Sequence, residues 1–147
     1  MIFLSENVYK EIAETLGRAP AERGGVLGSE NGGTVIKYYY DSTGISTGVS
    51  YSPDCDKINS VLENEWAQEN VQMVGIIHSH DNSCPYPSCS DIRYAEKIMR
   101  AAKMDTFYLP IVCTDPFKIN AYSVRLLDDG IRVIEEEIRI LGKTTGE

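Results

Sequence analysis

Two histidines, His78 and His80, are spaced as metal ligands would be. They follow the apolar run 71–77, which is typical of a buried central strand. Residues i and i+2 of a strand face the same side, so both imidazoles can converge on one ion. Asp91 stands eleven residues after His80, at the predicted start of a helix, where its carboxylate could be a third ligand. Two histidines, an aspartate and a water make a tetrahedral zinc site with an open position, as in catalytic zinc sites.

Hydrolysis at such a site also needs a carboxylate that lies near the metal without binding it and accepts a proton. Glu22 is the candidate, because it directly precedes Arg23-Gly24-Gly25 at the mouth of the first expected hairpin strand. The two glycines would let this backbone run close beside the strand that carries the histidines.

These residues together resemble a known signature. The chain is similar to the JAMM (MPN-plus) zinc metalloproteases and their prokaryotic JAB-type members, through Glu22, then Gly-Gly-Val-Leu-Gly, His78-Ser79-His80, seven residues, and Ser88-x-x-Asp91. The signature is specific, because it fixes the residue at five positions within 14 residues and adds a distal glutamate. The resemblance covers about residues 1–140 and implies a cytidine-deaminase-like α/β/α fold. It also implies hydrolysis of peptide or isopeptide bonds, usually beside ubiquitin or a ubiquitin-like tail.

The resemblance implies a role for each matched residue. His78, His80 and Asp91 would hold one zinc ion per chain. Glu22 would be the general base that activates the zinc-bound water and later protonates the leaving amine. Ser88 would donate a hydrogen bond to the oxyanion. Zinc lowers the pKa of its water to about 7, and one oxyanion donor is typically worth ~3 kcal/mol.

Substrate binding is expected beside the glycine-rich strand. Ser79 would shape the site. Gly24, Gly25 and Ser79 would all lie beside the bound substrate. An extended substrate tail is expected to lie across the exposed face beside residues 24–33, because glycines let another backbone come close.

The loop after the histidines departs from the family pattern. Asp81 stands where the family often has proline, and we expect its carboxylate to face water. Cys84 and Cys89 could join the two histidines in a structural Cys-Cys-His-His zinc module. The Cys-x4-Cys spacing is poor for a zinc finger, however, and leaves the signature's glutamate, serine and aspartate unexplained. A disulfide between these cysteines is disfavoured in a reducing compartment.

Two further classes can be compared with the signature. Zinc deaminases place a glutamate two residues after the ligand histidine and a Pro-Cys-x-x-Cys later. The residue two after His78 is His80, so the deaminase class is excluded. A non-catalytic MPN-type scaffold that binds a partner protein is the second hypothesis. Such scaffolds have usually lost metal ligands, whereas this chain keeps every one.

The elements that must position these residues follow from apolar spacing. Helices are predicted after Ser5, from Pro53 through Trp66, and from Ser88 or Ser90 onward. A hairpin is predicted around Asn31-Gly32-Gly33. Further strands are predicted at residues 71–77, 106–113, 118–126 and 131–140, and Pro110 marks one of them as irregular or edge-lying. The pattern indicates one α/β domain, residues 1–141, with a mixed sheet between helices and a polar tail at 142–147.

Composition narrows the class of partner and the compartment. The 147 residues include 22 acidic and 14 basic ones, a net charge of −8, which disfavours nucleic acid and anionic lipid as partners. No apolar run reaches the ~18 residues of a membrane helix, and the N-terminus is unlike a signal peptide. We therefore expect a cytoplasmic protein. Its expected activity is zinc-dependent hydrolysis of an amide bond at the Gly-Gly end of a ubiquitin-like or sulfur-carrier protein, or of a small amide.

Overall fold

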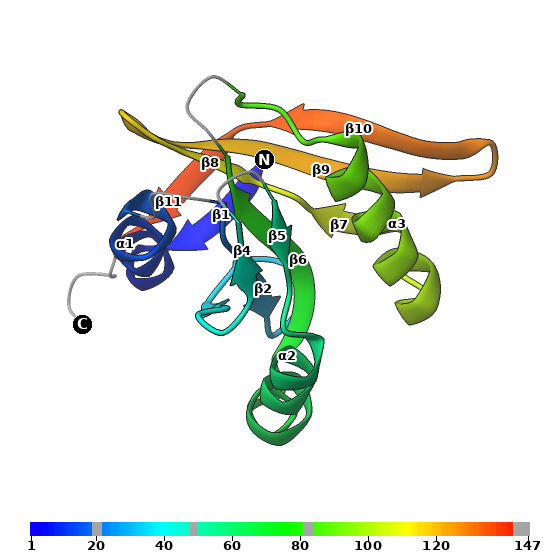
Figure 1. The fold of residues 1–147 in the computed structure, drawn as a ribbon. Helices are drawn as coiled ribbons and strands as arrows, with labels where there is room; N and C mark the ends of the chain where they lie inside the picture. The colour runs from blue at the N-terminus through cyan, green and yellow to red at the C-terminus, as the bar shows by residue number, and fades with distance from the viewer. Residues whose placement is uncertain (19–21, 48–49, 81–83, 143–147) are drawn as a thin grey trace.

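The computed structural model shows helices packed on both faces of a mixed seven-stranded sheet (Figure 1). It describes residues 1–18, 22–47, 50–80 and 84–142 of the chain. The strands are β1 (Ile2–Ser5), β2 (Gly24–Ser29), β3 (Lys37–Tyr40), β4 (Ile45–Ser46), β5 (Tyr51–Ser52), β6 (Gln72–Ser79), β7 (Thr106–Tyr108), β8 (Ile111–Thr114), β9 (Phe117–Leu127), β10 (Gly130–Glu136) and β11 (Ile138–Leu141). The helices are α1 (Glu6–Glu14), α2 (Cys55–Val61) and α3 (Cys89–Ala102).

Shorter helical turns extend two of these helices. A 3₁₀ turn, η1 (Leu16–Arg18), follows α1, and a π turn, η2 (Leu62–Trp66), and a 3₁₀ turn, η3 (Ala67–Glu69), follow α2. In the part of the chain that the structure describes, no helix is long and apolar enough to cross a membrane.

Strand β6, which ends with the histidines, lies near the middle of the sheet. The strand order is β10-β9-β7-β6-β2-β3, and β8 continues between β6 and β9 beyond β7. β6 runs antiparallel to β2 and parallel to β7 and β8, so the sheet is mixed, as predicted. His78 stands opposite Gly24 on one side and Ile111 on the other. The end of β6 is therefore held by neighbouring strands on both sides.

The adjacent residues Ile76 and Ile77 show how the two faces of the sheet are covered, because neighbours on a strand point to opposite faces. Ile77 belongs to the core cluster that α1 completes with Val8 and Ile12. Ile76 belongs to the cluster that α3 completes with Met99. The predicted three-layer α/β/α arrangement is confirmed.

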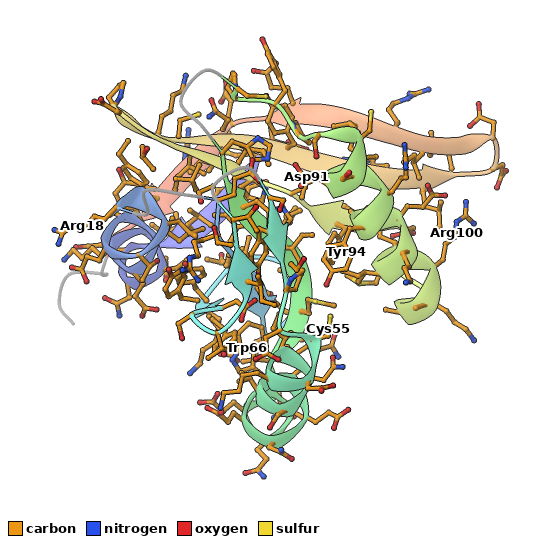
Figure 2. The ribbon with its side chains drawn as sticks, in the orientation of Figure 1. Arg18, Cys55, Trp66, Asp91, Tyr94 and Arg100 are labelled. Carbon is orange, nitrogen blue, oxygen red and sulfur yellow. The ribbon has the colours of Figure 1, made fainter. Side chains whose placement is uncertain are left out.

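The segment that begins with α2 covers the same face as α3. Val61 and Trp66 pack with Val26 of β2 and with Val71. Trp66, labelled beside the α2 segment in Figure 2, is almost fully buried. The helix predicted through Trp66 is confirmed to Val61 and then continues as the π turn.

Side-chain caps begin each helix. The Ser5 hydroxyl accepts a hydrogen bond from the Val8 N–H at 3.2 Å, as predicted for the first helix. The Asp54 carboxylate accepts one from the Lys57 N–H at 3.1 Å and starts α2. Such caps satisfy N–H groups that the first helical turn leaves without partners.

Several strand predictions need correction. The strand predicted at 131–140 is two strands, β10 and β11, and β11 leaves the main sheet to pair in parallel with β1. Pro110 does interrupt the strand at 106–113, but β7 and β8 lie between β6 and β9 and not at an edge. Proline has no N–H to donate to a neighbouring strand. The Pro110 carbonyl nevertheless accepts the His78 N–H at 3.3 Å, and this hydrogen bond accounts for the position of Pro110 inside the sheet. Residues 143–147 of the predicted tail lie outside the described residues.

Candidate metal centre

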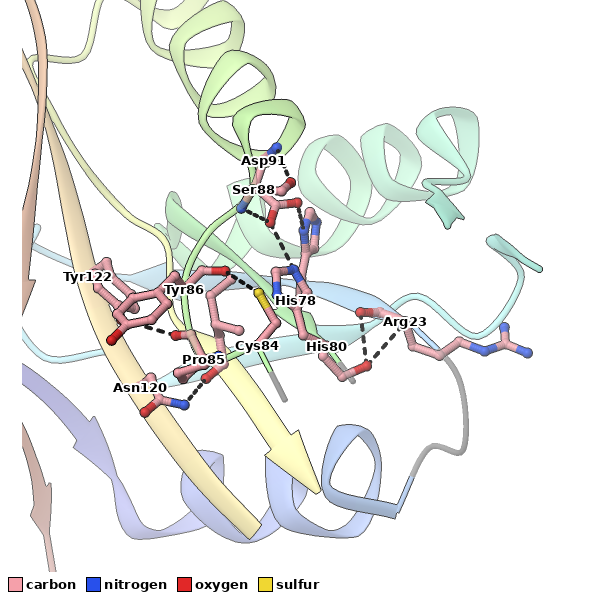
Figure 3. A network of polar contacts seen from close by, with 12 residues as sticks. Arg23, His78, His80, Cys84, Pro85, Tyr86, Ser88, Asp91, Asn120 and Tyr122 are labelled. Carbon is pink, nitrogen blue, oxygen red and sulfur yellow. Dashed lines mark hydrogen bonds and ion pairs between the residues drawn. The ribbon is translucent and has the colours of Figure 1, made fainter. Parts of the chain in front are cut away.

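The two histidine side chains at the end of β6 meet the carboxylate of Asp91. The Nδ1 atom of His78 lies 2.8 Å from Oδ1 of Asp91, and Nε2 of His80 lies 2.9 Å from Oδ2 (Figure 3). All three residues are about nine-tenths buried. The predicted same-face placement of the histidines and the approach of the helix start are both observed.

The start of α3 holds Asp91 by a reciprocal pair of hydrogen bonds. The Ser88 hydroxyl accepts from the Asp91 N–H at 3.0 Å, and the Asp91 carboxylate accepts from the Ser88 N–H at 2.9 Å. Figure 2 shows Asp91 at the N-terminal end of α3, where the helix dipole favours a negative charge. The Ser88 hydroxyl can still donate its hydrogen, because a hydroxyl has one donor and two acceptor sites.

The environment fixes the charges of this cluster. Burial by itself raises the pKa of Asp91, but the hydrogen bonds from His78 and His80 hold that pKa well below its usual range. Burial lowers the pKa of His80, whereas the hydrogen bond and charge of Asp91 raise it, with a net value of about 9. Asp91 is therefore negatively charged at neutral pH, which is the state in which a carboxylate binds a metal ion.

A cleft of about 430 Å³ opens over these residues. It brings together the three expected ligands and the expected catalytic residues, Glu22 and Ser88. Its full lining is Glu22, Arg23, Ser50, Tyr51, His78, Ser79, His80, Cys84, Ser88, Ser90 and Asp91. Residues distant in the sequence, before β2 and after β6, thus share one concave surface.

The segment that carries Glu22 is tied to the end of β6 through Ser79. The Arg23 N–H donates to the Ser79 hydroxyl at 2.9 Å, and the Ser79 N–H donates to the Arg23 carbonyl at 2.9 Å. Ser79 is 1% exposed, so its side chain is directed into this backbone contact. Glu22 directly precedes Arg23 in the chain, is half-buried and lines the cleft.

Gly24 and Gly25 lie inside the sheet. Both are buried, and β2 is paired with β3 on one side and β6 on the other. The expectation of an exposed face beside residues 24–33 is therefore wrong for β2, because its residues are buried and its backbone is paired on both sides. Gly24 instead allows close packing. A Cβ placed there would lie 2.8 Å from the His78 ring and closer still to the Tyr51 ring.

The donor set fits zinc, although the ligands stand closer together than a bound ion requires. Two imidazole nitrogens and one carboxylate are the ligands of open zinc sites. Two atoms bound to one tetrahedral zinc lie about 3.3 Å apart, whereas the nitrogen–oxygen pairs here are 2.8 and 2.9 Å apart. Within residues 1–18, 22–47, 50–80 and 84–142, no three His, Cys, Asp or Glu side chains already surround a metal position.

The two cysteines of the loop occupy different places. Both thiols are exposed and unpaired. Cys84 lines the cleft beside His80, with its Sγ 3.7 Å from the Tyr86 carbonyl, whereas Cys89 begins α3 and is absent from the lining. The Cys-Cys-His-His arrangement of a structural zinc module is not assembled by the described side chains. Asp81 lies outside the described residues.

The sequence gives no signal for Tyr51, which forms one wall of the cleft. Its ring meets the His78 ring edge-on, with centroids 5.3 Å apart and an interplanar angle of 75°. Its hydroxyl donates to Asp41, a fully buried carboxylate. Burial and the hydrogen bond to Asp41 raise the pKa of Tyr51, so the phenol keeps its proton.

Comparison with known proteins agrees with this fold. The protein resembles, at 24% identity and a TM-score of 0.71, the solution structure of protein DSY2949 from Desulfitobacterium hafniense, over 99% of this chain and 97% of that one. This likeness concerns the fold. None of the curated proteins compared matches the chain. The family model of prokaryotic homologs of the JAB domain matches residues 5–125. The chain therefore belongs to the prokaryotic JAB domain family.

Proposed function

We propose that this protein is a zinc-dependent hydrolase of amide bonds. One observation carries the proposal: two histidines, an aspartate, a glutamate and a serine from separate elements line the same cleft of about 430 Å³. A structural metal site needs ligands but no carboxylate and hydroxyl beside them, and it leaves no open position for substrate. The arrangement therefore favours catalysis over a purely structural role.

His78, His80 and Asp91 would hold the ion, which when bound lowers the pKa of water and polarises a carbonyl group. Glu22 accepts the proton of the attacking water and passes it to the leaving amine. Ser88 donates its hydroxyl hydrogen to the oxygen on which negative charge develops, and its exposed place at the start of α3 leaves it accessible to substrate. Ser79 holds the segment next to Glu22 against β6.

The proposed substrate is the Gly-Gly end of a ubiquitin-like or sulfur-carrier protein, or of its conjugate, and the proposed compartment is the cytoplasm. Support comes from the site class and from the net charge of −8, which disfavours polyanionic substrates. Because β2 is paired on both sides, the tail would enter over the cleft and not along β2.

The test compares wild-type protein, Glu22→Gln and the exposed control Glu30→Gln, all loaded with zinc. The probes are a fluorogenic amide of a Gly-Gly peptide and a ubiquitin-like protein fused through Gly-Gly to a reporter. General-base loss typically lowers the rate by 10²–10⁴-fold, so Glu22→Gln should lose turnover while keeping its zinc. Equal turnover by wild type and Glu22→Gln, or no turnover by zinc-loaded wild type on either probe, would leave the non-catalytic scaffold as the better account.

A further inference from the structure

We infer that Tyr51 and Asp41 are positioning residues for His78, which hold its imidazole in the orientation that a metal ion needs. The inference rests on the proposed function, because it concerns His78 as a ligand. Neither residue belongs to the signature. Tyr51 lies on the short strand β5, and Asp41 directly follows β3.

Tyr51 confines the His78 ring from one side. The edge-on contact, with centroids 5.3 Å apart, places the two rings against each other at the wall of the cleft. Gly24, opposite His78 in the neighbouring strand, completes the confinement. A Cβ at Gly24 would collide with both rings, so the two rings pack closely against the glycine. Tyr51 and Gly24 therefore bound the imidazole on the side away from the open cleft.

Asp41 in turn confines Tyr51. Its Oδ2 atom accepts hydrogen bonds from the Tyr51 hydroxyl and, at 3.0 Å, from the Asp54 N–H at the start of α2. The backbone N–H of Asp41 donates to the Gly24 carbonyl at 3.0 Å. Asp41 is thus fixed by its main chain to the strand beside His78, and by its side chain to the ring that contacts His78.

The burial of Asp41 makes this link strong. The residue is 0% exposed, and its second oxygen, Oδ1, makes no hydrogen bond within the described residues. A buried carboxylate that loses a donor is destabilised, so Oδ2 keeps the Tyr51 hydroxyl in place. The chain of contacts Asp41–Tyr51–His78 therefore fixes the ring orientation of one ligand. Residues that orient metal ligands typically contribute 10–100-fold to metal affinity.

Tyr51→Phe is the decisive variant, because it removes the hydroxyl and keeps the ring. Tyr38→Phe is the matched control: Tyr38 is also buried and its hydroxyl is hydrogen-bonded, to Thr15 at 2.7 Å, in the core that α1 covers. Zinc affinity is measured by competition with a chelator, and Co²⁺ absorption reports ligand geometry. NMR of the two histidine rings gives a readout without metal, with His80→Gln used to assign them. Asp41→Asn, which keeps the volume of the buried group, is the supporting variant.

Tyr51→Phe should weaken zinc binding by about tenfold, change the Co²⁺ spectrum and shift the His78 ring signals, and Tyr38→Phe should do none of these. Unchanged His78 signals and unchanged zinc affinity in Tyr51→Phe would overturn the inference. A wild-type protein that fails to bind zinc, while Tyr51→Phe still shifts the His78 signals, would count against the proposed function and leave the ring positioning standing. The two failures are thereby distinguished.

Discussion

Ser88 and Asp91 hold each other at the start of α3, each side chain accepting the backbone N–H of the other at 3.0 and 2.9 Å. The same Asp91 oxygen that accepts from Ser88 lies 2.9 Å from the His80 ring. One capping motif therefore fixes a metal ligand and the proposed oxyanion donor relative to each other. The serine three residues before the aspartate therefore has a structural role in the cap in addition to its proposed chemical role.

Replacing Ser88 with alanine should affect both roles. Loss of the cap should lower the free energy of unfolding by about 1 kcal/mol, and loss of the oxyanion donor should lower kcat by about 10²–10³-fold. Ser5→Ala is the matched control, because Ser5 caps α1 in the same way, away from the cleft. It should lose comparable stability without losing turnover. Urea unfolding and the Gly-Gly amide assay measure the two effects, and equal turnover by the two variants would contradict the role of Ser88.

Replacing Gly24 with alanine should overpack the wall of the cleft. The added Cβ meets the Tyr51 and His78 rings within van der Waals distance, and such overpacking typically costs about 1–3 kcal/mol. Gly142→Ala is the control, since a Cβ there meets only the Glu6 carboxylate at 3.7 Å. The free energy of unfolding, measured with urea, and the zinc affinity should both fall in Gly24→Ala. Both should stay at the wild-type value in Gly142→Ala. A Gly24→Ala protein as stable as wild type would contradict the close packing of these rings.

The proposed metal ligands could be predicted from the sequence, but the residues that contact and position them could not. His78 and His80 are predictable because strand periodicity is local, and Asp91 because a serine cap marks the helix start. Tyr51 and Asp41 come from separate elements with no fixed spacing to the histidines, so only the folded chain brings them together. The pairing of β1 with β11 is likewise non-local, since Ile2 stands opposite Ile138. Pro110 indicated a break in the strand. Its position inside the sheet depends on β6 and β9 lying on either side of it, which the local pattern could not predict.

The loop cysteines should be dispensable for the metal. Cys84→Ser and Cys89→Ser should each bind one zinc per chain with nearly wild-type affinity, because the proposed ligands are the histidines and Asp91. His78→Ala, which removes a proposed ligand, serves as the positive control and should lose zinc. Metal content after dialysis measures all three. Release of zinc from both cysteine variants would instead support the structural zinc module.

The cap of α2 should make stability depend on pH in acid. Hydrogen bonds from the Thr43 hydroxyl and the Lys57 N–H lower the pKa of Asp54. A group whose pKa is lowered on folding stabilises the fold above its unfolded pKa of about 3.9, and this contribution is lost as pH falls through the lowered value. Asp54→Asn keeps a hydrogen-bond acceptor without the charge. Its free energy of unfolding should therefore be lower than that of wild type at pH 5, and this difference should shrink as the pH falls to 2. Urea unfolding across this pH range is the measurement, and a constant deficit would refute the prediction.

X-ray absorption at the zinc edge of the purified protein tests the central claim most directly, because it identifies the atoms bound to the metal. We expect a shell of nitrogen and oxygen neighbours alone, near ~2.0 Å, from His78, His80, Asp91 and water. Sulfur neighbours near ~2.3 Å would place the loop thiols on the metal and contradict the open catalytic site. A protein without zinc, even after reloading, would contradict the claim that these residues form a metal centre.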